Sequence, residues 1–339
     1  MSANSKKILP AEWFEQRFVQ LTWPHAQTDW GYMLDEVTNC FVNIAREIIK
    51  HEDLLIVTPD PEKVQVFFAP DEILNIKIIQ MRTNDTWARD HAGISVFEDG
   101  EPVIYDFTFN GWGMKFPANF DNQITRNIFE QGYFPENFRY NNCLDFILEG
   151  GSIESNGAGV LLTTSQCLLS VNRNWTSKEE MEFRLKAYFN AEKILWLNHG
   201  YLSGDDTDCH VDMLARFCDS QTIVYVKCDD EQDEHFVELK EMESELLSFN
   251  DLNQTSFNLV SLPMADPIYE LNERLPATYA NFLIINEAVL MPTYHSDKDE
   301  IARIQLKKAF PDREIVGIDC RALIKQHGSL HCVTMQFPK

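Results

Sequence analysis

The chain of 339 residues has few basic side chains for its length: 29 lysines and arginines stand against 53 aspartates and glutamates, for a formal net charge of −24. A surface that binds nucleic acid needs the opposite sign, so we expect no nucleic-acid partner. An acidic surface commonly serves solubility, and it also attracts a cationic substrate. The two interpretations are compatible.

Long apolar runs are also missing. No run approaches the roughly 18–20 residues of a membrane span, so we expect no membrane partner. Residues 1–7 contain two lysines without a following apolar stretch, and we expect no secretory signal. None of the eight cysteines forms a C-x-x-C pair, which disfavours a structural zinc site. Such cysteines are typical of free thiols in a reducing compartment, and we expect a cytoplasmic protein.

No linker rich in proline, glycine or serine divides the chain, so we expect a single catalytic domain over residues 1–339. Five times, a helical pattern runs into a short apolar strand. The predicted helices are residues 35–50, 122–131, 177–189, 235–247 and 298–310. The strands that follow them are residues 54–57, 146–148, 194–197, 258–262 and 315–318.

Hairpin patterns accompany several of these strands. Residues 151–155 pair with 159–164 through a turn at Asn156-Gly157, and residues 282–285 pair with 288–291 through Asn286-Glu287. Repeated helix-plus-hairpin units favour α/β blades arranged around an axis. The alternative is an open doubly wound sheet.

One cysteine differs from the others. Cys332 stands at the end of a short β-like run, after Gly328 and Ser329, small residues that let backbone or ligand come close. Most of the other cysteines lie inside apolar patterns typical of a core. They are Cys40, Cys143, Cys167, Cys218, Cys228 and Cys320.

A polar cluster surrounds the histidine of Thr207-Asp208-Cys209-His210-Val211-Asp212. On an extended backbone Asp208, His210 and Asp212 face one way, since side chains alternate with period 2. A metal cluster or a solvated loop would explain the same pattern. The metal interpretation is weak because no second histidine lies at ligand spacing.

Two further carboxylates follow apolar strands. Asp90 comes after the predicted strand at 73–81, and Glu149 follows 146–148 and precedes two glycines. Polar residues at strand ends are common in active sites on rigid scaffolds. A cysteine, a histidine and several carboxylates are together the groups needed to attack a guanidinium carbon through a thiolate.

These segments together resemble the agmatine deiminases (agmatine iminohydrolases), a branch of the guanidine-modifying superfamily related to peptidylarginine deiminases of the bacterial type. The resemblance spans nearly the whole chain, and its specificity lies in the order and spacing of the motifs. The motifs are LPAEW at 9–13, TWPH at 22–25, NDTWARD at 84–90, FNGWG at 109–113, EGGSIE at 149–154, LTT at 162–164, NRN at 172–174, DDTDCHVD at 205–212 and LHC at 330–332.

The resemblance implies an α/β fold, a fivefold pseudo-symmetric propeller (pentein) of ββαβ-type blades. It implies Cys332 as nucleophile, His210 as general acid and base, and Asp90 and Asp212 as guanidinium anchors. Glu149 would orient and charge His210. The chain departs from the family pattern at Cys209, where glycine is usual, at His327-Gly328-Ser329, where glycines are usual, and at residues 91–93.

The implied reaction is hydrolysis of agmatine to N-carbamoylputrescine and ammonia through a covalent thiouronium on Cys332, a step toward putrescine in polyamine biosynthesis. No metal or organic cofactor is expected, because the substrate already carries the charge. An ammonium tail favours aromatic faces or acids, which Trp87, Trp112 and Asp208 offer, and the one cation in residues 107–122 is Lys115. Core packing would equally explain both tryptophans.

Three other functions stay open at this point. A related deiminase would act on arginine or peptidyl arginine. A non-catalytic propeller would serve as a binding module, although it would have no need of all four chemical groups. A generic Cys–His amide hydrolase would leave the two aspartates without a role. A homo-oligomer is also left open.

Overall fold

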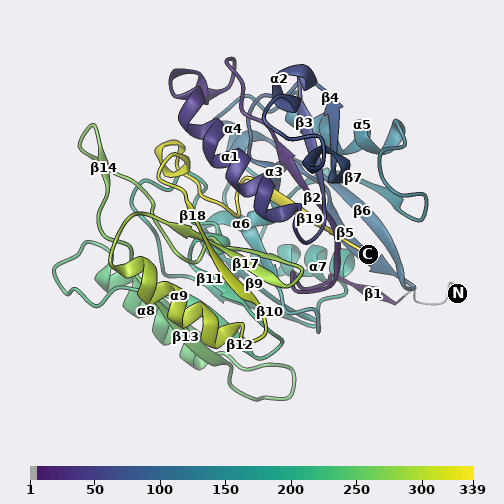
Figure 1. Ribbon diagram of the computed structural model, residues 1–339. Helices are drawn as coiled ribbons and strands as arrows, with labels where there is room; N and C mark the ends of the chain where they lie inside the picture. Colours follow the sequence, from purple (N-terminus) through teal and green to yellow (C-terminus); the bar gives the residue numbers. More distant parts are fainter. Residues whose placement is uncertain (1–5) are drawn as a thin grey trace, which may run out of the picture.

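The computed structural model describes residues 6–339 as a mixed α/β structure in which short strands alternate with helices (Figure 1). The expectation of no secretory signal rests partly on residues 1–5, which lie outside the described residues. Within residues 6–339, no helix is both long enough and apolar enough to cross a membrane.

Five of the six sheets formed by residues 6–339 follow one plan, and each is open. Each contains an antiparallel strand pair, and one strand of that pair also pairs in parallel with a third strand, which a helix connects to it. Two of the five sheets have a fourth strand at one edge, β1 in one and β4 in the other. The sheets are β1 (Lys7–Ile8), β5 (Ile94–Glu98), β6 (Glu101–Thr108), β7 (Arg139–Ile147); β8 (Ile153–Ser155), β9 (Val160–Thr164), β10 (Lys193–Leu197); β11 (Ala215–Phe217), β12 (Thr222–Lys227), β13 (Asn258–Pro263); β16 (Leu283–Ile285), β17 (Ala288–Thr293), β18 (Glu314–Asp319); and β19 (Thr334–Pro338), β2 (Gln16–Thr22), β3 (Asp53–Thr58), β4 (Ile76–Gln80).

The sixth sheet is the small hairpin of β14 (Tyr269–Glu270) and β15 (Glu273–Arg274). The two hairpins predicted from the sequence are confirmed as the antiparallel pairs β8–β9 and β16–β17. The five predicted strands are also confirmed, since they coincide with β3, the end of β7, β10, β13 and β18.

The crossover helices confirm the five helical predictions to within two residues at each end. They are α1 (Leu34–Ile48), α5 (Ile124–Glu130), α7 (Lys178–Phe189), α8 (Phe236–Ser248) and α9 (Lys298–Ala309). Helix α1 forms because Val37, Phe41, Ile44 and Ile48 repeat at helical spacing, and all four are buried against the sheets. Shorter helices lie in the connections: α2 (Pro61–Gln65), α3 (Ala88–His91), α4 (Gly111–Met114), α6 (Ser165–Leu168), and the 3₁₀ turns η1 (Asp29–Tyr32), η2 (Glu72–Asn75), η3 (Asp121–Gln123), η4 (Gly150–Ser152), η5 (Val211–Met213) and η6 (Leu323–Gln326).

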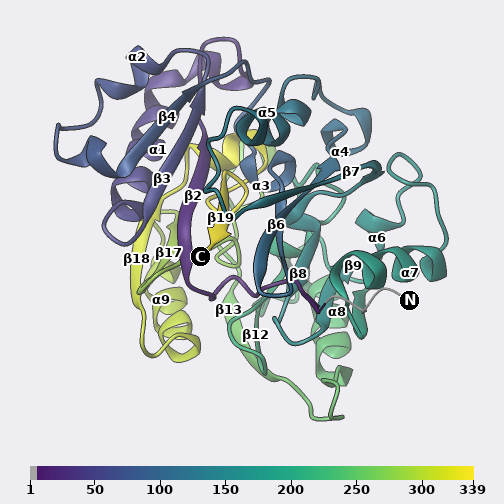
Figure 2. The ribbon, with the colours of Figure 1, turned by 90° about the vertical axis from the view of Figure 1, so that its right-hand side faces the viewer.

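The two ends of the chain meet in one sheet. Strand β19, near the C-terminus, pairs antiparallel with β2, near the N-terminus, and the two lie side by side at the centre of Figure 2. This pairing places the segment that precedes β19 inside the molecule. Cys332 therefore lies in a turn immediately before a strand, which corrects the prediction that it ends a β-run.

Candidate active site

The structure brings together five side chains that are spread over 243 positions of the chain (90 to 332). Asp90 lies in the short helix α3, Glu149 between β7 and η4, His210 and Asp212 at the start of η5, and Cys332 before β19. Each is at most 3% exposed. Ionisable groups are rarely buried in this way without partners, so the cluster is a candidate reaction centre.

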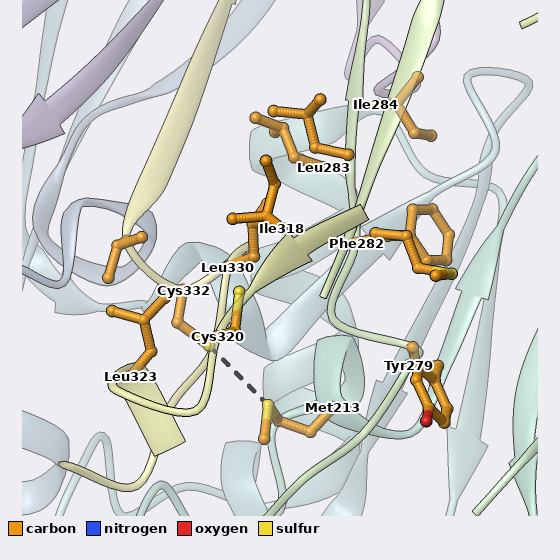
Figure 3. Close-up of a cluster of buried hydrophobic side chains, with 14 of the residues drawn as sticks. Met213, Tyr279, Phe282, Leu283, Ile284, Ile318, Cys320, Leu323, Leu330 and Cys332 are labelled. Carbon is orange, nitrogen blue, oxygen red and sulfur yellow. Dashed lines mark hydrogen bonds between the residues drawn. The ribbon is translucent and has the colours of Figure 1, made fainter. Parts of the chain in front are cut away.

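The sulfur of Cys332 lies among both polar and apolar neighbours. It is 3.7 Å from Asp212 Oδ2 and 3.2 Å from Asn281 Nδ2. On its apolar side the Cys332 sulfur is 3.8 Å from Met213 Sδ, a contact that is drawn as a dashed line in Figure 3. Burial, together with the negative charges of Asp212 and Asp90, holds the pKa of the Cys332 thiol well above its ordinary value. The resting group is therefore a neutral thiol.

Asp90 is held by two donors, the backbone N–H of Gly151 at 3.0 Å and the indole N–H of Trp112 at 2.9 Å. Burial raises its pKa to about 6, with the charges of Asp212 and Glu149 adding to the rise and His210 opposing it.

Asp212 accepts a hydrogen bond from His331 Nδ1 at 2.7 Å on Oδ2. Burial acts to raise the pKa of Asp212, but the hydrogen bond and the charge of His331 outweigh it, and the pKa is lowered. The other oxygen, Oδ1, is buried without a hydrogen-bond partner. An unpartnered buried carboxylate oxygen has an unmet need for a donor, which a ligand can supply.

Gly151 allows these groups to converge. A Cβ at this position would lie 2.7 Å from His210 Nδ1, 2.9 Å from Asp90 Oδ1 and 3.1 Å from Asp212 Oδ2. Any side chain would therefore push apart the histidine and the two carboxylates. The second glycine of the Glu149-Gly150-Gly151 motif thus has a steric explanation within the site.

His210 belongs to a buried chain of ion pairs that favours its protonated form. Its Nε2 lies 3.2 Å from Glu149 Oε2, and the same oxygen accepts a hydrogen bond from Arg173 Nε at 2.7 Å. Burial acts against protonation, but Asp90, Cys167 and Glu149 outweigh it and raise the pKa of His210 well above its ordinary value. His210 Nδ1 makes no hydrogen bond and lies 3.6 Å from Asp90 Oδ1. Its proton is thus available at the reaction centre.

The backbone of this segment differs from the prediction. Asp208 and Cys209 have left-handed conformations, with φ of 67° and 64°, so residues 208–212 are not extended. Cys209 occupies a conformation that suits glycine. Because of this turn, Asp208 does not face the same way as His210 and Asp212. Its two oxygens bind Arg173 at 2.6 Å and Lys115 at 2.8 Å.

A cavity that is partly open to solvent is lined by Cys332 and Asp90. Trp87 and Trp112 line it, with their rings edge to face and 6.5 Å apart, and their role in substrate binding stays a prediction. Gly328 also lines it, and a Cβ there would lie 2.2 Å from the Trp87 ring. The glycine therefore keeps the Trp87 side of the cavity open.

Three acids of the cavity wall had no place in the sequence prediction, namely Asp29, Asp85 and Asp206. Burial raises the pKa of Asp85 to about 7, and the charges of Asp29 and Asp121 add to the rise. Asp206 is part of the DDTDCHVD motif, but nothing in its local pattern distinguishes it from Asp208. Asp29 is the first residue of η1 and Asp85 lies in the loop before α3, so their approach to each other depends on tertiary packing.

Two clusters within residues 6–339 have donor atoms close enough to hold a metal ion: Glu149 with Cys167 and His210, and Glu12 with Glu154 and His331. In the first, Glu149 is already paired with Arg173. In the second, Arg216 pairs with both glutamates. A guanidinium already neutralises each cluster and disfavours a cation there. The absence of a metal or other cofactor stays a prediction.

Comparison with known proteins gives one consistent result. The family model of the Porphyromonas-type peptidyl-arginine deiminases matches residues 8–338. The agmatine deiminase of Pseudomonas aeruginosa is 30% identical, over 97% of this chain and 95% of its own length.

Solved structures agree with this result. One from Porphyromonas gingivalis, provisionally named an arginine deiminase, is 52% identical with a TM-score of 0.95, covering 98% of this chain and 99% of its own. A cysteine-to-serine variant of the C. jejuni agmatine deiminase, with substrate bound, is 38% identical with a TM-score of 0.92, covering 100% of this chain and 98% of its own. The chain therefore belongs to the agmatine deiminase family of hydrolases, within the Porphyromonas-type peptidyl-arginine deiminases.

Proposed function

We propose that this protein hydrolyses agmatine to N-carbamoylputrescine and ammonia through a covalent intermediate on Cys332. The observation that carries the proposal is the convergence of two buried aspartates, Asp90 and Asp212, on a buried thiol, with one oxygen of Asp212 lacking a partner. A guanidinium is planar and presents its N–H donors in a fixed fork, so two carboxylates are suited to hold it.

The thiolate forms when substrate enters. The thiol of Cys332 is neutral at rest because burial and the two carboxylates raise its pKa. A guanidinium between Asp90 and Asp212 neutralises their effect and adds a positive charge beside the sulfur, which lowers that pKa. The thiol gives its proton to solvent, and the resulting thiolate attacks the guanidinium carbon, with the sulfur electron pair forming the C–S bond. The cysteine-to-serine variant of the C. jejuni enzyme, which was solved with substrate bound, is in line with a cysteine that reacts.

His210 supplies and recovers the proton. It begins as an imidazolium, since its pKa is raised, and it gives its proton to the leaving nitrogen as ammonia departs. The neutral ring then takes a proton from water, whose oxygen attacks the thiouronium carbon. Breaking the C–S bond returns the thiolate and releases the urea product, which gives up its extra proton so that the resting thiol is restored. Glu149 and Arg173 hold His210 in place throughout.

The ammonium tail of agmatine is suited to the outer cavity. Trp87, Trp112 and Phe116 offer aromatic faces there, and Asp85 and Asp206 offer carboxyl groups. No lysine or arginine is among the described residues that line the cavity. We assign binding of the ammonium group to Asp206 in place of Asp208, because Arg173 and Lys115 occupy both oxygens of Asp208.

Arginine and peptidyl arginine remain the alternative substrates, and the name of the P. gingivalis structure favours arginine. The α-carboxylate of arginine would have to enter a cavity that is lined by three acids and, among the described residues, by no lysine or arginine that could pair with it. Desolvation and repulsion both oppose that arrangement. We therefore place agmatine ahead of arginine by at least about 100-fold in kcat/KM, which is about 2.7 kcal/mol.

Several wider predictions belong to the same proposal. The five sheets are taken as ββαβ blades of a fivefold propeller, with residues 1–339 as one catalytic domain. The protein is placed in the cytoplasm and in polyamine biosynthesis, with agmatine as its small-molecule partner and with no nucleic-acid or cofactor requirement. Self-association into a homo-oligomer is compatible with it.

The test is ammonia release from agmatine, from arginine and from an arginyl peptide, measured by steady-state kinetics at one ionic strength. Preferential turnover of agmatine supports the proposal. Equal rates, or a preference for arginine or an arginyl peptide, would remove agmatine as the substrate and leave only the deiminase class. No ammonia from any of the three would favour the non-catalytic binding module.

A further inference from the structure

One buried polar side chain touches the proposed nucleophile and has no part in the mechanism given above. Asn281 lies in the connection that precedes β16, and its side chain is fully buried. Its amide nitrogen Nδ2 is 3.2 Å from the sulfur of Cys332. Within residues 6–339, it is the one side chain whose N–H donates to that sulfur.

The backbone fixes which way the amide of Asn281 points. Its oxygen Oδ1 accepts the backbone N–H groups of His331 at 2.8 Å and of Cys332 at 3.3 Å. Both partners are donors, so they require the oxygen on their side and the NH₂ group on the other. A flipped amide would place donors against donors. The amide atom nearest the sulfur is therefore an N–H donor at 3.2 Å, while Oδ1, at 3.5 Å, can accept from the S–H group only while the thiol is neutral.

The ionisable groups around the sulfur mostly oppose its ionisation. Asp212 Oδ2 lies 3.7 Å away, and Asp90 lines the same cavity as Cys332. His210 lies beside Asp90 rather than against the sulfur, and His331 is engaged with Asp212. The remaining neighbours, such as Met213 in Figure 3, provide no charge. An N–H donor is stabilised by a negative sulfur and gains little from a neutral one.

We propose that Asn281 is a catalytic residue that donates a hydrogen bond to the thiolate of Cys332 and thereby sets its nucleophilicity. The bond strengthens when the S–H bond breaks and charge collects on sulfur. It weakens as the sulfur electron pair forms the C–S bond, and it strengthens again when that bond breaks and the thiolate returns. The inference rests on Cys332 as the nucleophile, but the acidity of the thiol can be measured without substrate.

The experiment is alkylation of Cys332 by iodoacetamide as a function of pH, followed by mass spectrometry of the peptide that contains it. Asn281→Asp keeps an oxygen for the two backbone donors but presents an acceptor and a negative charge to the sulfur. Asn281→Ala removes the donor without adding charge. Asn286→Asp is the matched control, because Asn286 also bonds to backbone, at Gln16, but does not touch Cys332. Near-UV circular dichroism checks that each variant is folded.

We expect both Asn281 variants to shift the alkylation profile of Cys332 toward higher pH by at least about one unit, so that the rate at a fixed lower pH falls at least about tenfold. Asn286→Asp should leave the profile unchanged. A role confined to shaping the turn would change the rate but not the midpoint. Profiles that coincide with wild type in both folded Asn281 variants would overturn the inference. A shifted profile in a protein that releases no ammonia from agmatine would leave the hydrogen bond standing and remove the proposed substrate.

Discussion

Asp90→Asn removes the negative charge of one proposed guanidinium anchor while keeping a side chain of nearly the same shape. In the native site one oxygen of Asp90 accepts from Gly151 and the other from Trp112. An asparagine keeps one acceptor and turns an NH₂ group toward the other donor. The variant therefore loses the negative charge that faces the substrate and one of its two hydrogen bonds. Breaking a buried charge pair in this way costs roughly 3 kcal/mol or more, or about 150-fold in kcat/KM.

The pH profile adds a second readout. The pKa of Asp90 is about 6, and only the ionised carboxylate holds the substrate. In the wild type, kcat/KM should therefore fall as pH falls through about 6, because kcat/KM reports the free enzyme. In Asp90→Asn that acidic limb should disappear, since residue 90 no longer titrates. Ammonia release from agmatine, measured across the pH range, gives both the magnitude and the profile.

Asp106→Asn is the matched control. Asp106 is likewise buried, its pKa is also raised to about 6 by burial, and one aromatic donor, Tyr140, binds it at 2.6 Å. It is absent from the cavity wall, so its variant should keep kcat/KM and the acidic limb. Near-wild-type kinetics in Asp90→Asn, or an acidic limb that persists in this variant, would refute the assignment of Asp90 as a guanidinium anchor.

Three further variants test other parts of the account. Glu149→Gln should lower kcat, because it weakens the charge that keeps His210 protonated, and the pH profile of kcat should move to lower pH. Asp206→Asn should reduce the advantage of agmatine over butylguanidine, which lacks the ammonium, when the two are compared by kcat/KM. Gly328→Ala should reduce kcat/KM for agmatine while the protein stays folded, because its Cβ meets the Trp87 ring at 2.2 Å.

Each of these has a contradicting result. An unchanged kcat profile in Glu149→Gln would detach Glu149 from the acid–base step. An undiminished preference for agmatine over butylguanidine in Asp206→Asn would remove Asp206 from the tail site. Full activity in Gly328→Ala would mean that Trp87 can move without consequence. Melting temperatures of the three variants serve as the common control for folding.

The regular parts of the fold could be predicted from the sequence because they follow local periodicity. The apolar spacing in residues 35–50 predicts α1 directly, and the polar turn residues Asn156 and Gly157 predict the β8–β9 hairpin. The backbone at residues 208–212 could not be predicted in the same way. Cys209 adopts a left-handed conformation without being a glycine, so the usual signal of a turn is missing.

The sequence motifs predicted five site residues, and the structure places all five in one buried cluster. They are Asp90, Glu149, His210, Asp212 and Cys332. Asn281 and Arg173 were missed as members of that cluster for a physical reason. Each contributes through a contact between segments that are far apart in the chain. Arg173 lies in the NRN motif at 172–174, but its sequence gives it no role, and Asn281 lies in none of the motifs. Their signal lies in three-dimensional packing, where a buried polar atom has to find a partner.

The central claim is that Cys332 forms a covalent bond to the guanidinium carbon of agmatine. The most direct test is rapid acid quenching of the reaction with agmatine, followed by mass spectrometry of the peptide that contains Cys332, with Cys332→Ser as the control. The account predicts a transient adduct on Cys332 with the mass of agmatine less that of ammonia, and a folded Cys332→Ser protein that shows neither adduct nor turnover. Turnover in Cys332→Ser at more than a few per cent of the wild-type rate, or an adduct on another residue, would contradict it.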